Sequence, residues 1–343
     1  MKKIQEGKVI FKANLSGKDK GPGKIKGVFY NPSMKLSRDL HVEFAKQFDF
    51  KGTMLDGMAA SGIRGMRLML ESNIRVEFCD SSELAINTIK ENLESNNLKT
   101  NVYHENIEDH LSENKYEWID IDPFGTPAPY LESAVDSVDI DGILGISATD
   151  TAVLCGAKPS VCKKRYGAMS MRGIAAKEVG IRILLGKIHS IASEKGKGIE
   201  PLLSYSEGHH LRTFVRVIEN NECRLKWLTE RMEMVNKEEE KAAGPLWGGK
   251  IIDKKLVPEY SDGKLGKLIT MLSEEADGPP GLYDINDIAR EALIGQTPKR
   301  QKIIESLRKL GDFASSSVFS PLGIKTNASK ETRIKAAQLA QSL

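Results

Sequence analysis

Between residues 53 and 147 the sequence alternates short apolar runs with helix-like segments, and no other feature limits the fold as strongly. Helical spacing is clear over residues 62–71 and again after Ser82, where Leu84, Ile89 and Leu93 are spaced to face inward. The apolar runs of strand length are residues 53–56, 75–80, 101–104, 116–121 and 142–147. Strands that alternate with helices form a parallel sheet with right-handed crossovers. The pattern therefore predicts an α/β fold with a Rossmann-like sheet.

After residue 147 the regular alternation of short strands and helices ends. A long helix is predicted over residues 168–194, and two closing strands over residues 201–206 and 211–217. The composition then shifts, and residues 237–249 are mostly charged, small or typical of turns. We expect two domains: residues 1–222, with a basic N-terminal extension, and residues 223–343.

The last sixty residues favour a smaller α+β domain. Asp284 is placed to cap one helix, Thr297 and Pro298 to start a second, and Gly311 to end it. Residues 313–326 have the serines, proline and glycine of a small hairpin. Two helices followed by a hairpin predict a winged-helix-like segment.

The composition excludes several classes of protein. Hydrophobic residues make up 40% of the 343 and charged residues 28%, as is usual in globular domains. Apolar runs are far shorter than the roughly 20 residues of a membrane span, and no secretory signal is visible. The four cysteines contain no C-x-x-C pair, so neither a zinc ribbon nor a disulfide framework is expected. We therefore expect a cytoplasmic protein without a metal site.

Basic residues cluster in two places, although the net charge is only +3. Residues 1–38 contain ten lysines and arginines against Glu6 and Asp19. The second group consists of Lys158, Lys163, Lys164, Arg165 and Arg172. Either group fits a polyanion such as nucleic acid, and either fits an ordinary solvated surface equally well.

The segment from Asp56 to Gly65 links the first predicted strand to its helix and has the composition of a cofactor-binding turn. Gly57, Gly62 and Gly65 allow close approach to a backbone, and the helix start offers free N–H groups. Asp80 ends the next strand 24 residues later (80 − 56), where an acid can bind both ribose hydroxyls. Alternatively, Asp56 caps the turn and Asp80 caps the following helix. Together the residues favour an adenosine-containing cofactor.

Two cofactors compete for this turn. A nicotinamide dinucleotide prefers G-x-G-x-x-G for its pyrophosphate, whereas S-adenosyl-L-methionine has no phosphate and tolerates the looser turn. The methionine carboxylate needs a cation, and Arg38 or Arg64 is able to supply one. Asn106, after the third strand, is placed to meet the adenine edge. We favour the methyl donor.

Asp122-Pro123-Phe124-Gly125 follows the fourth strand and indicates the second substrate. The Asp122 carboxylate and the Pro123 carbonyl can accept hydrogen bonds from one NH2 group, while Phe124 stacks on the ring that carries it. Ligands of open α/β sheets bind at this edge. A turn at the end of a strand is the simpler alternative for Asp122. The arrangement favours methyl transfer to the exocyclic amine of a base.

The chain resembles the tRNA (guanine-26-N2)-dimethyltransferase family over most of its length. The motifs that carry the resemblance are VFYNPSMKLSRD at 28–39, DGMAASGIRG at 56–65, IDIDPFGTP at 119–127, ATDTAVLCG at 148–156, YSEGHHLR at 205–212, GPLW at 244–247 and GIKT at 323–326. The resemblance implies a class I methyltransferase that transfers two methyl groups from S-adenosyl-L-methionine to N2 of a guanine in tRNA.

The resemblance also implies roles for individual residues. Arg38 would hold the carboxylate end of the donor, Arg64 would lie on the cofactor turn and Asp80 would bind the ribose. Asn106 and Ile107 would line the adenine, although similar proteins tend to have aspartate in place of Asn106. The guanine would be held by Asp122, Pro123 and Phe124. Some relatives have paired cysteines before GPLW, but this chain has only Cys223 there, so zinc is not expected.

The residues alone are also compatible with other functions. The Asp-Pro-aromatic motif serves any base amine, so an adenine-N6-type nucleic-acid methyltransferase is an alternative. A non-enzymatic nucleic-acid-binding regulator is a further one. His209, His210 and Arg212 are able to contact RNA or shape the pocket, while structural roles suit the two histidines at least as well. The sequence does not fix the oligomeric state, and we favour a monomer.

Overall fold

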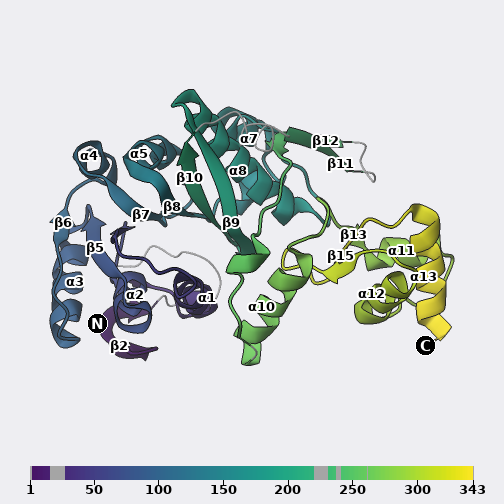
Figure 1. Cartoon of the computed structure of the whole chain (residues 1–343), viewed down its shortest axis with the longest axis horizontal. Helices are drawn as coiled ribbons and strands as arrows, with labels where there is room; N and C mark the ends of the chain where they lie inside the picture. The colour runs from purple at the N-terminus through teal and green to yellow at the C-terminus, as the bar shows by residue number, and fades with distance from the viewer. Residues whose placement is uncertain (1, 16–27, 220–230, 237–240, 261, 343) are drawn as a thin grey trace. The chain divides into compact units, whose positions relative to one another are not determined.

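The structure, a computed structural model, describes residues 2–15, 28–219, 231–236, 241–260 and 262–342. These residues form two compact units (Figure 1). The first comprises Met1–Asp150, Ile188–Leu202 and Glu207–Leu228, and the second Thr151–Lys187, Leu203–Ser206 and Thr229–Leu343. The predicted domain boundary between residues 222 and 223 lies outside the described residues, as does Cys223.

A seven-stranded sheet with the order β6-β5-β4-β7-β8-β10-β9 is the centre of the fold. The pairs β6–β5, β5–β4, β4–β7 and β7–β8 are parallel, whereas β10 is antiparallel to β8. The strands are β4 (Thr53–Gly57), β5 (Arg75–Asp80), β6 (Val102–His104), β7 (Tyr116–Ile121), β8 (Val138–Ala148), β9 (Lys197–Glu207) and β10 (His210–Glu219). The predicted α/β fold with a parallel sheet over residues 53–147 is confirmed, and β10 extends this sheet with an antiparallel strand.

Helices cover both faces of this sheet in the first unit. In Figure 1 the pair α1 and α2 lies on one side of the strands, and the pair α4 and α5 on the other. The helices are α1 (Lys35–Ala45), α2 (Ile63–Ser72), α3 (Glu83–Ser95), α4 (Ile107–Glu113) and α5 (Leu131–Ser137). An N-terminal hairpin, β1 (Lys2–Glu6) and β2 (Val9–Leu15), with β3 (Phe29–Tyr30), was not predicted.

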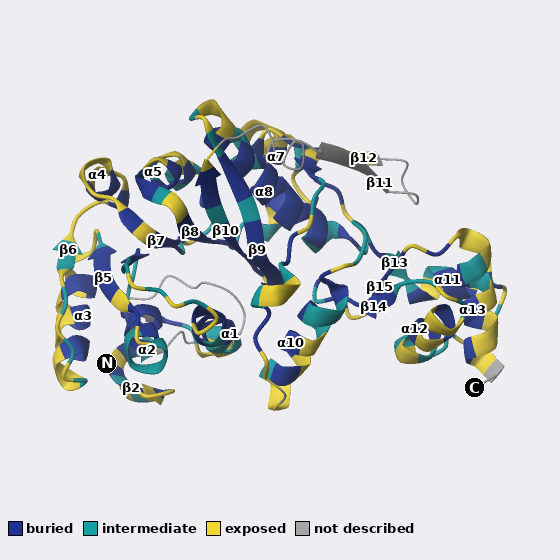
Figure 2. Cartoon of the chain, in the orientation of Figure 1, coloured by how far each residue is buried: buried dark blue, intermediate teal, exposed yellow. Residues whose placement is uncertain are grey.

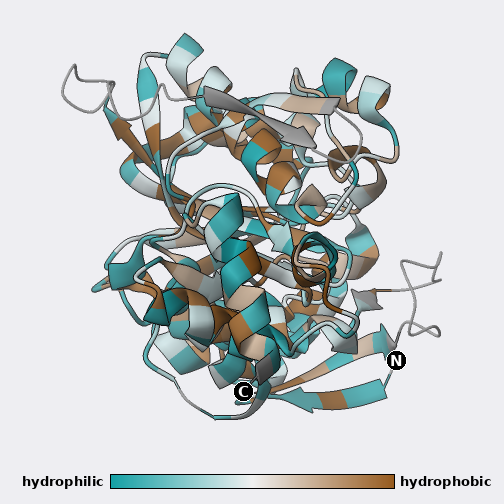
Figure 3. Ribbon diagram, turned by 90° about the vertical axis from the view of Figure 1, so that its right-hand side faces the viewer, coloured by the Kyte–Doolittle hydropathy of each residue, from teal (hydrophilic) through white to brown (hydrophobic). Residues whose placement is uncertain are grey.

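The core of the first unit lies where the helices meet the sheet. Strands β7, β8 and β10 are buried along most of their length (Figure 2). Along individual helices brown and teal residues alternate, which is the pattern of helices with one buried side (Figure 3). The prediction that Leu84 faces inward is wrong, because Leu84 is 48% exposed. Ile86, Ile89 and Leu93 are buried residues of this helix. Position 86 shares the 3.6-residue stripe of 89 and 93.

The second unit begins directly after β8. Its first helices are α6 (Thr151–Leu154), α7 (Pro159–Tyr166) and α8 (Ala176–Glu194). The predicted start of the long helix at residue 168 is wrong, because Gly167 and Gly173 adopt φ of +76° and +120°, which a continuous helix does not allow. The hairpin of β11 (Arg231–Asn236) and β12 (Lys241–Trp247) follows the sheet in sequence.

The C-terminal part contains α10 (Gly263–Glu275), β13 (Tyr283–Asp284), α11 (Ile285–Glu291), α12 (Arg300–Lys309), β14 (Ala314–Ser316), β15 (Gly323–Thr326) and α13 (Lys330–Ser342). Asp284 caps α11 as predicted, with its carboxylate accepting the Asn286 N–H at 2.8 Å. The predicted start of the next helix at Pro298 is wrong, because α12 begins at Arg300. β14 and β15 pair antiparallel as a hairpin. A winged-helix-like arrangement stays a prediction.

A buried group of charges joins distant segments of this second unit. Glu178 Oε1 on α8 accepts hydrogen bonds from Arg182 Nε at 2.9 Å and Lys325 Nζ at 2.8 Å. The backbone N–H of Gly281 reaches the same oxygen at 3.2 Å. Burial raises the pKa of Glu178, but Lys325 and then Arg182 outweigh it and lower that pKa. The carboxylate is therefore charged and depends on cations from two parts of the chain.

In the part of the chain that the structure describes, no helix has the length and apolar character needed to cross a membrane.

Candidate active site

The order of the strands creates a switch point between β4 and β7. After β4 the chain continues to β5 and β6 on one side of the sheet, and it then crosses to β7 on the other. In open α/β sheets, ligands bind outside the carboxyl ends of the strands at such a point. Asp56 lies near the end of β4 and Asp122 directly follows β7. The predicted site residues therefore collect at this edge.

The turn between β4 and α2 has an unusual backbone. Met58 and Ala60 adopt φ of 61° and 50°, in the left-handed region that residues other than glycine rarely enter. Hydrogen bonds from Ala59 N to Cys79 O (3.2 Å) and from Gly62 N to Ala59 O (2.8 Å) hold this shape. Such strain costs on the order of 1 kcal/mol per residue and is typical of ligand-binding turns.

Asp80 joins this turn to the end of β5. Its Oδ2 accepts the N–H of Ala60 at 2.9 Å, and its Oδ1 accepts the N–H of Ser82 at 2.9 Å. A carboxylate has about four acceptor positions, so these two bonds leave others available. Asp80 therefore supports the turn and still has acceptor capacity for hydroxyl groups.

Asp56 lies beneath the turn and is only 2% exposed. Its Oδ2 accepts the N–H of Gly65 at 2.9 Å, at the start of α2. Burial, followed by the charge of Asp120, raises the pKa of Asp56 to about 8, so the carboxyl is mostly protonated at pH 7. The structure thus places Asp56 as an internal support of the turn.

Gly57 at the end of β4 lies against Ile107, which follows β6 and Asn106 in the sequence. A Cβ on Gly57 would lie 2.9 Å from both the Asp120 carbonyl oxygen and Ile107 Cδ1, so only glycine fits without movement. Ile107 is buried at the start of α4. Asn106 caps that helix, with its side-chain oxygen accepting the Glu108 N–H at 2.9 Å. Contact of Asn106 and Ile107 with adenine stays a prediction.

Asp122 forms an ion pair with Arg64. Asp122 Oδ2 accepts a short hydrogen bond from Arg64 Nη2, while Asp122 Oδ1 lies 3.9 Å from His210 Nε2. Burial raises the pKa of Asp122, but the Arg64 guanidinium and the other neighbouring groups, among them Arg212, together outweigh it and hold that pKa well below its usual range. The side chain is 29% exposed, so a permanently charged acceptor faces solvent at the sheet edge.

The loop after Asp122 presents an aromatic ring. Phe124 is 69% exposed, which is unusual for a phenylalanine, whereas Pro123 is buried. Gly125, with φ of +90°, donates its N–H to Thr149 Oγ1 at 2.8 Å and accepts the Thr149 N–H at 2.8 Å. The loop is therefore tethered to the end of β8, which keeps Phe124 beside the sheet edge.

A second ion pair, fully buried, lies behind Asp122. Arg212 on β10 forms a bidentate pair with Asp120 on β7, and both side chains are 0% exposed. The strand between them carries Gly145, whose register partners are Asp120 on β7 and Phe214 on β10. Because Gly145 has no side chain, the two charged groups can meet across β8.

Replacing Gly145 with alanine should destabilise the protein by about 1–3 kcal/mol. A Cβ at this position would lie 2.5 Å from Asp120 Oδ2 and 2.7 Å from Arg212 Nη2, and neither paired group has room to move. Urea unfolding measures the change. Gly295→Ala is the control, since Gly295 is exposed and a Cβ there meets nothing within 4 Å. Equal stability of the two variants would contradict this account.

The hydrogen bonds of Arg38 go to Glu6 of the N-terminal hairpin and to Asn31, and not to the predicted cofactor turn. Its Nε and Nη2 bind the Glu6 carboxylate at 2.7 and 2.6 Å, and its guanidinium lies 5.0 Å from the centre of the Tyr30 ring. Burial raises the pKa of Glu6, but Arg38 outweighs it and lowers that pKa to about 2. Nη2 also donates to the Asn31 carbonyl oxygen at 3.2 Å, so three N–H groups of Arg38 are used within the protein. Contact of Arg38 with the methionine carboxylate stays a prediction.

Several residues of the site were missed from the sequence, among them Asp120, Ser147 and the buried His41. His41 Nδ1 lies 3.4 Å from Arg64 Nη1, and burial, followed by the nearby Arg212 and Arg64 charges, lowers the pKa of His41 well below its usual value. The available signal was an acid at position 120 and a base at position 212, each inside a largely apolar strand. Buried charges need partners, and these two have opposite signs.

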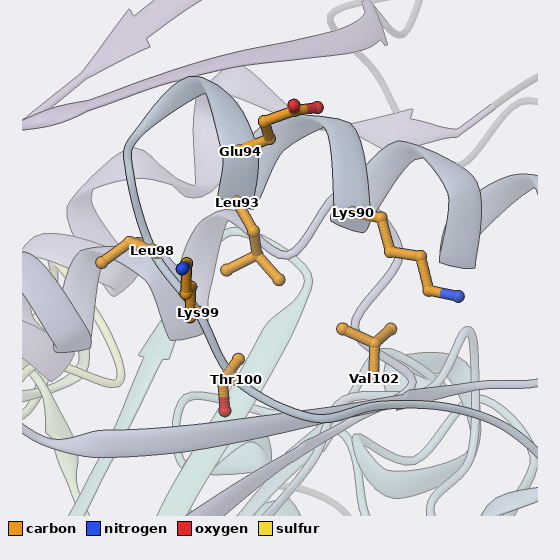
Figure 4. Close-up of a pocket in the computed structure, with 7 residues that line it drawn as sticks. All are labelled: Lys90, Leu93, Glu94, Leu98, Lys99, Thr100 and Val102. Atoms are coloured by element: carbon orange, nitrogen blue, oxygen red, sulfur yellow. The ribbon is translucent and has the colours of Figure 1, made fainter.

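A cavity of about 330 Å³ lies away from this site, between α3 and the strand β6 (Figure 4). Leu93 and Val102 point into it, and Lys90 and Glu94 stand at its rim. None of the predicted site residues lines it. Within the described ranges, no group of three or more His, Cys, Asp or Glu side chains is arranged to hold a metal ion.

Known proteins resemble the chain over nearly its whole length. It is 33% identical over 317 residues to the tRNA (guanine(26)-N(2))-dimethyltransferase of Thermoplasma volcanium, covering 90% of each chain. The enzyme of the same name from Pyrococcus abyssi is 35% identical over 349 residues, covering 89% of this chain and 91% of that one. A solved structure of Trm1 from Pyrococcus horikoshii with S-adenosyl-L-methionine superposes with a TM-score of 0.86, at 32% identity, covering 98% and 99%.

The sheet order, the turn after β4 and the acid at the end of β5 define a methyltransferase of the class I fold. The predicted fold class is therefore confirmed. The family described as N2,N2-dimethylguanosine tRNA methyltransferase matches residues 12–237 and 221–338. The chain belongs to this family.

Proposed function

We propose that the chain transfers one or two methyl groups from S-adenosyl-L-methionine to the exocyclic N2 of guanine 26 in tRNA, and that it does so in the cytoplasm. The observation that carries the proposal is the ionised Asp122, which lies beside the exposed Phe124 at the edge of the sheet that also bears the turn after β4. The names of the relatives and of the superposed structure support the same donor and the same base.

The residues of the turn fit this donor. The backbone from Met58 to Gly62 is held in a preformed shape, and Asp80 has acceptor positions left for the two ribose hydroxyls. Asn106 and Ile107 would line the adenine, and Gly57 and Asp56 would keep the turn closed. Arg38 would reach the methionine carboxylate with its remaining N–H groups. Arg64 would act mainly on Asp122, since their side chains are already paired.

The donor, when bound, supplies an activated methyl group on a positively charged sulfur. Guanine N2 is a poor nucleophile because its lone pair is delocalised into the ring. The Asp122 carboxylate and the Pro123 carbonyl oxygen would accept its two N–H groups and favour rotation of the amine out of conjugation. Holding the reactants in line is worth roughly 7–11 kcal/mol in comparable reactions.

The low pKa of Asp122 indicates how the site treats charge. Positive charge develops on N2 as it is alkylated, and an ionised carboxylate within hydrogen-bond reach stabilises that charge. Asp122 is a weak base while paired with Arg64, yet an alkylated aromatic amine is acidic enough to give up its proton to it. Asp122 then returns the proton to water, and the amine is ready for a second methylation.

The base must leave the tRNA stack to reach Asp122, which costs a few kcal/mol. Phe124 would replace part of the lost stacking, because its ring is 69% exposed beside Asp122. This role explains why a large aromatic side chain is left open to solvent.

We further propose α7 as a surface that binds tRNA phosphates. Its exposed Lys163 and Lys164, with Lys158 just before it, form no ion pair among the described residues, and the helix contains no acidic residue. Gly156 packs directly on the backbone of residues 171–172, which fixes Arg172 against the turn before α7. Lys158, Lys163 and Lys164 therefore present positive charge that no acidic side chain among the described residues pairs with, and this suits binding to a polyanion.

The N-terminal basic group is a weaker candidate for the same role. Lys12 pairs with Glu91 at 3.1 Å and Lys35 with Asp39 at 2.7 Å, so part of this charge is already compensated. Four of its lysines, at positions 18, 20, 24 and 26, lie outside the described residues.

Replacing Lys163 and Lys164 together with glutamate should weaken tRNA binding at least about tenfold at low salt. The slope of log K against log salt should fall by about two, one for each lost phosphate contact. Fluorescence anisotropy with labelled tRNA measures both quantities. The charge-matched control is Lys90→Glu with Lys99→Glu, two exposed lysines beside the cavity of Figure 4. The same slope in both double variants would argue against α7.

The proposed reaction is tested by mass spectrometry of nucleosides. Unmodified tRNA transcripts with guanine or adenine at position 26 are incubated with the protein and isotopically labelled donor. We expect N2-methylguanosine and N2,N2-dimethylguanosine from the first transcript and no product from the second. Methyladenosine from the second transcript would favour an adenine-N6 enzyme, and absence of product from both would contradict the proposal.

A further inference from the structure

The carboxylate of Glu6 lies where the N-terminal hairpin meets α1 and α2. Its Oε1 accepts hydrogen bonds from Arg38 Nε at 2.7 Å and from Arg67 Nη1 at 3.0 Å. Its Oε2 accepts from Arg38 Nη2 at 2.6 Å and from the Tyr30 hydroxyl at 2.7 Å. A carboxylate has about four acceptor positions, so Glu6 has none left for a ligand. Its role is to hold two arginines.

This group of side chains is buried and charged. The side chains of Glu6, Arg38 and Arg67 are 1%, 7% and 4% exposed. Burial raises the pKa of Glu6, but Arg38, Tyr30 and Arg67 together lower it to about 2, so the carboxylate is ionised at neutral pH. A bidentate, charge-assisted pair fixes the plane of a guanidinium as well as its position. Glu6 therefore holds Arg38 in one orientation.

The hydrogen bonds of Arg38 leave one of its nitrogens available. A guanidinium has one hydrogen on Nε and two on each of Nη1 and Nη2. Glu6 accepts the Nε hydrogen and one on Nη2, and the Asn31 carbonyl oxygen accepts from Nη2 at 3.2 Å. Among the described residues, Nη1 donates no hydrogen bond. Two unused hydrogens on a nearly buried cation favour a negatively charged ligand at Nη1.

The same two helices connect Arg38 to the site at the sheet edge. Arg64, which binds Asp122, and Arg67 are three residues apart and share a face of α2. On α1 the same spacing separates Arg38 from His41, whose Nδ1 lies 3.4 Å from Arg64 Nη1. α2 itself begins at the end of the turn that we propose for the donor. The arginines held by Glu6 are therefore neighbours of the groups around that turn.

We propose that Glu6 is a positioning residue of the donor site: its carboxylate fixes the Arg38 guanidinium so that Nη1 binds the carboxylate of S-adenosyl-L-methionine. The inference rests on the role proposed above for Arg38 and adds the residue on which that role depends. Because Glu6 orients Arg38 in advance, the side chain loses little freedom when the donor binds. The N-terminal hairpin, which the sequence did not predict, thus takes part in donor binding through Glu6.

Two ligands separate the positioning of Arg38 from a purely structural role of Glu6. S-adenosyl-L-methionine carries the carboxylate, whereas 5′-methylthioadenosine has the adenosine and the sulfur but no amino-acid part. Isothermal titration with each ligand gives the ratio of the two affinities for every variant. Arg38→Ala should weaken binding of S-adenosyl-L-methionine about ten- to a hundredfold, because charge-assisted hydrogen bonds are lost, and should change binding of 5′-methylthioadenosine by less than about twofold.

Glu6→Gln keeps the size of the side chain but removes its charge and one acceptor oxygen. We expect S-adenosyl-L-methionine to bind about five- to tenfold more weakly, with 5′-methylthioadenosine unaffected. Tyr30→Phe removes one of the bonds to Glu6 and should give a selective loss of about two- to threefold. Glu91→Gln is the matched control, because the half-exposed Glu91 pairs with Lys12 of the same hairpin at 3.1 Å. It should change neither affinity.

The outcomes distinguish this inference from the proposed function. An unchanged affinity ratio in Glu6→Gln, or an equal loss for both ligands, would overturn the positioning role. If thermal unfolding shows that Glu6→Gln does not fold, Tyr30→Phe decides by the same ratio, and an unchanged ratio there overturns the role. An unchanged ratio in Arg38→Ala would refute the proposed contact of Arg38 with the methionine carboxylate itself.

Discussion

Asp122→Ala should reduce kcat for methyl transfer to tRNA about 100- to 1000-fold, the range seen when a preorganised charge-stabilising group is removed. The variant loses the acceptor for the N2 hydrogen atoms and the charge that stabilises alkylated nitrogen. Affinity for S-adenosyl-L-methionine should be nearly unchanged, because the hydrogen bond of the Asp122 side chain goes to Arg64 on α2 and, among the described residues, none goes to residues 58–62 of the turn before it. Single-turnover kinetics and calorimetry measure the two quantities.

Asp122→Asn serves as the companion variant. It keeps the shape of the side chain and one acceptor oxygen but removes the charge, and it leaves Arg64 with Asp120, whose Oδ1 lies 3.7 Å from Arg64 Nε. A large loss of kcat in both variants indicates that charge, rather than shape, drives the effect. Activity within tenfold of wild type in Asp122→Ala would refute its place in the site.

Asp80→Ala should weaken the binding of S-adenosyl-L-methionine about 10- to 100-fold, which corresponds to one or two hydrogen bonds to a charged group. Two causes act together. The ribose hydroxyls lose their acceptor, and the N–H of Ala60, held in a left-handed conformation, loses the oxygen that fixes it at 2.9 Å. Isothermal titration with the donor measures the change.

Glu83→Ala is the matched control for this prediction. Glu83 is an exposed carboxylate three residues further along, at the start of α3, and has no part in the turn. Donor affinity should therefore match that of the wild type. Equal affinity in Asp80→Ala and wild type would remove Asp80 from the donor site and with it the placement of the adenosine.

The sheet and its edge could be predicted from the sequence because their signals are local. β5 spans residues 75–80 as predicted. Asp80 ends that apolar run, and Asp122 directly follows the run that forms β7. The predicted start of a helix was less accurate where a glycine with positive φ interrupts the helical backbone. The spacing of apolar residues continues through 168–175, but left-handed φ at Gly167 and Gly173 ends one helix and delays the next. The spacing of apolar residues does not reveal whether a glycine adopts helical or left-handed φ.

The pairing of charges could not be predicted, because it depends on register across the sheet. Arg64 was expected at the donor, yet its guanidinium lies on Asp122, 58 positions away in the sequence. Arg212 and Asp120 meet only because β8 places Gly145 between them. A one-residue shift of any of these strands would point the charges to the other face. The partners of buried ions therefore become known only with the tertiary structure.

The tie between Glu178 and Lys325 limits how the protein can be dissected. A polypeptide that stops near residue 222, chosen to isolate catalysis from RNA binding, would keep Glu178 and Arg182 but lose the ammonium group and the Gly281 amide that complete the cluster. A buried carboxylate stripped of part of its counter-charge is strongly destabilising. The two activities are better separated by point substitutions in the intact protein than by deletion.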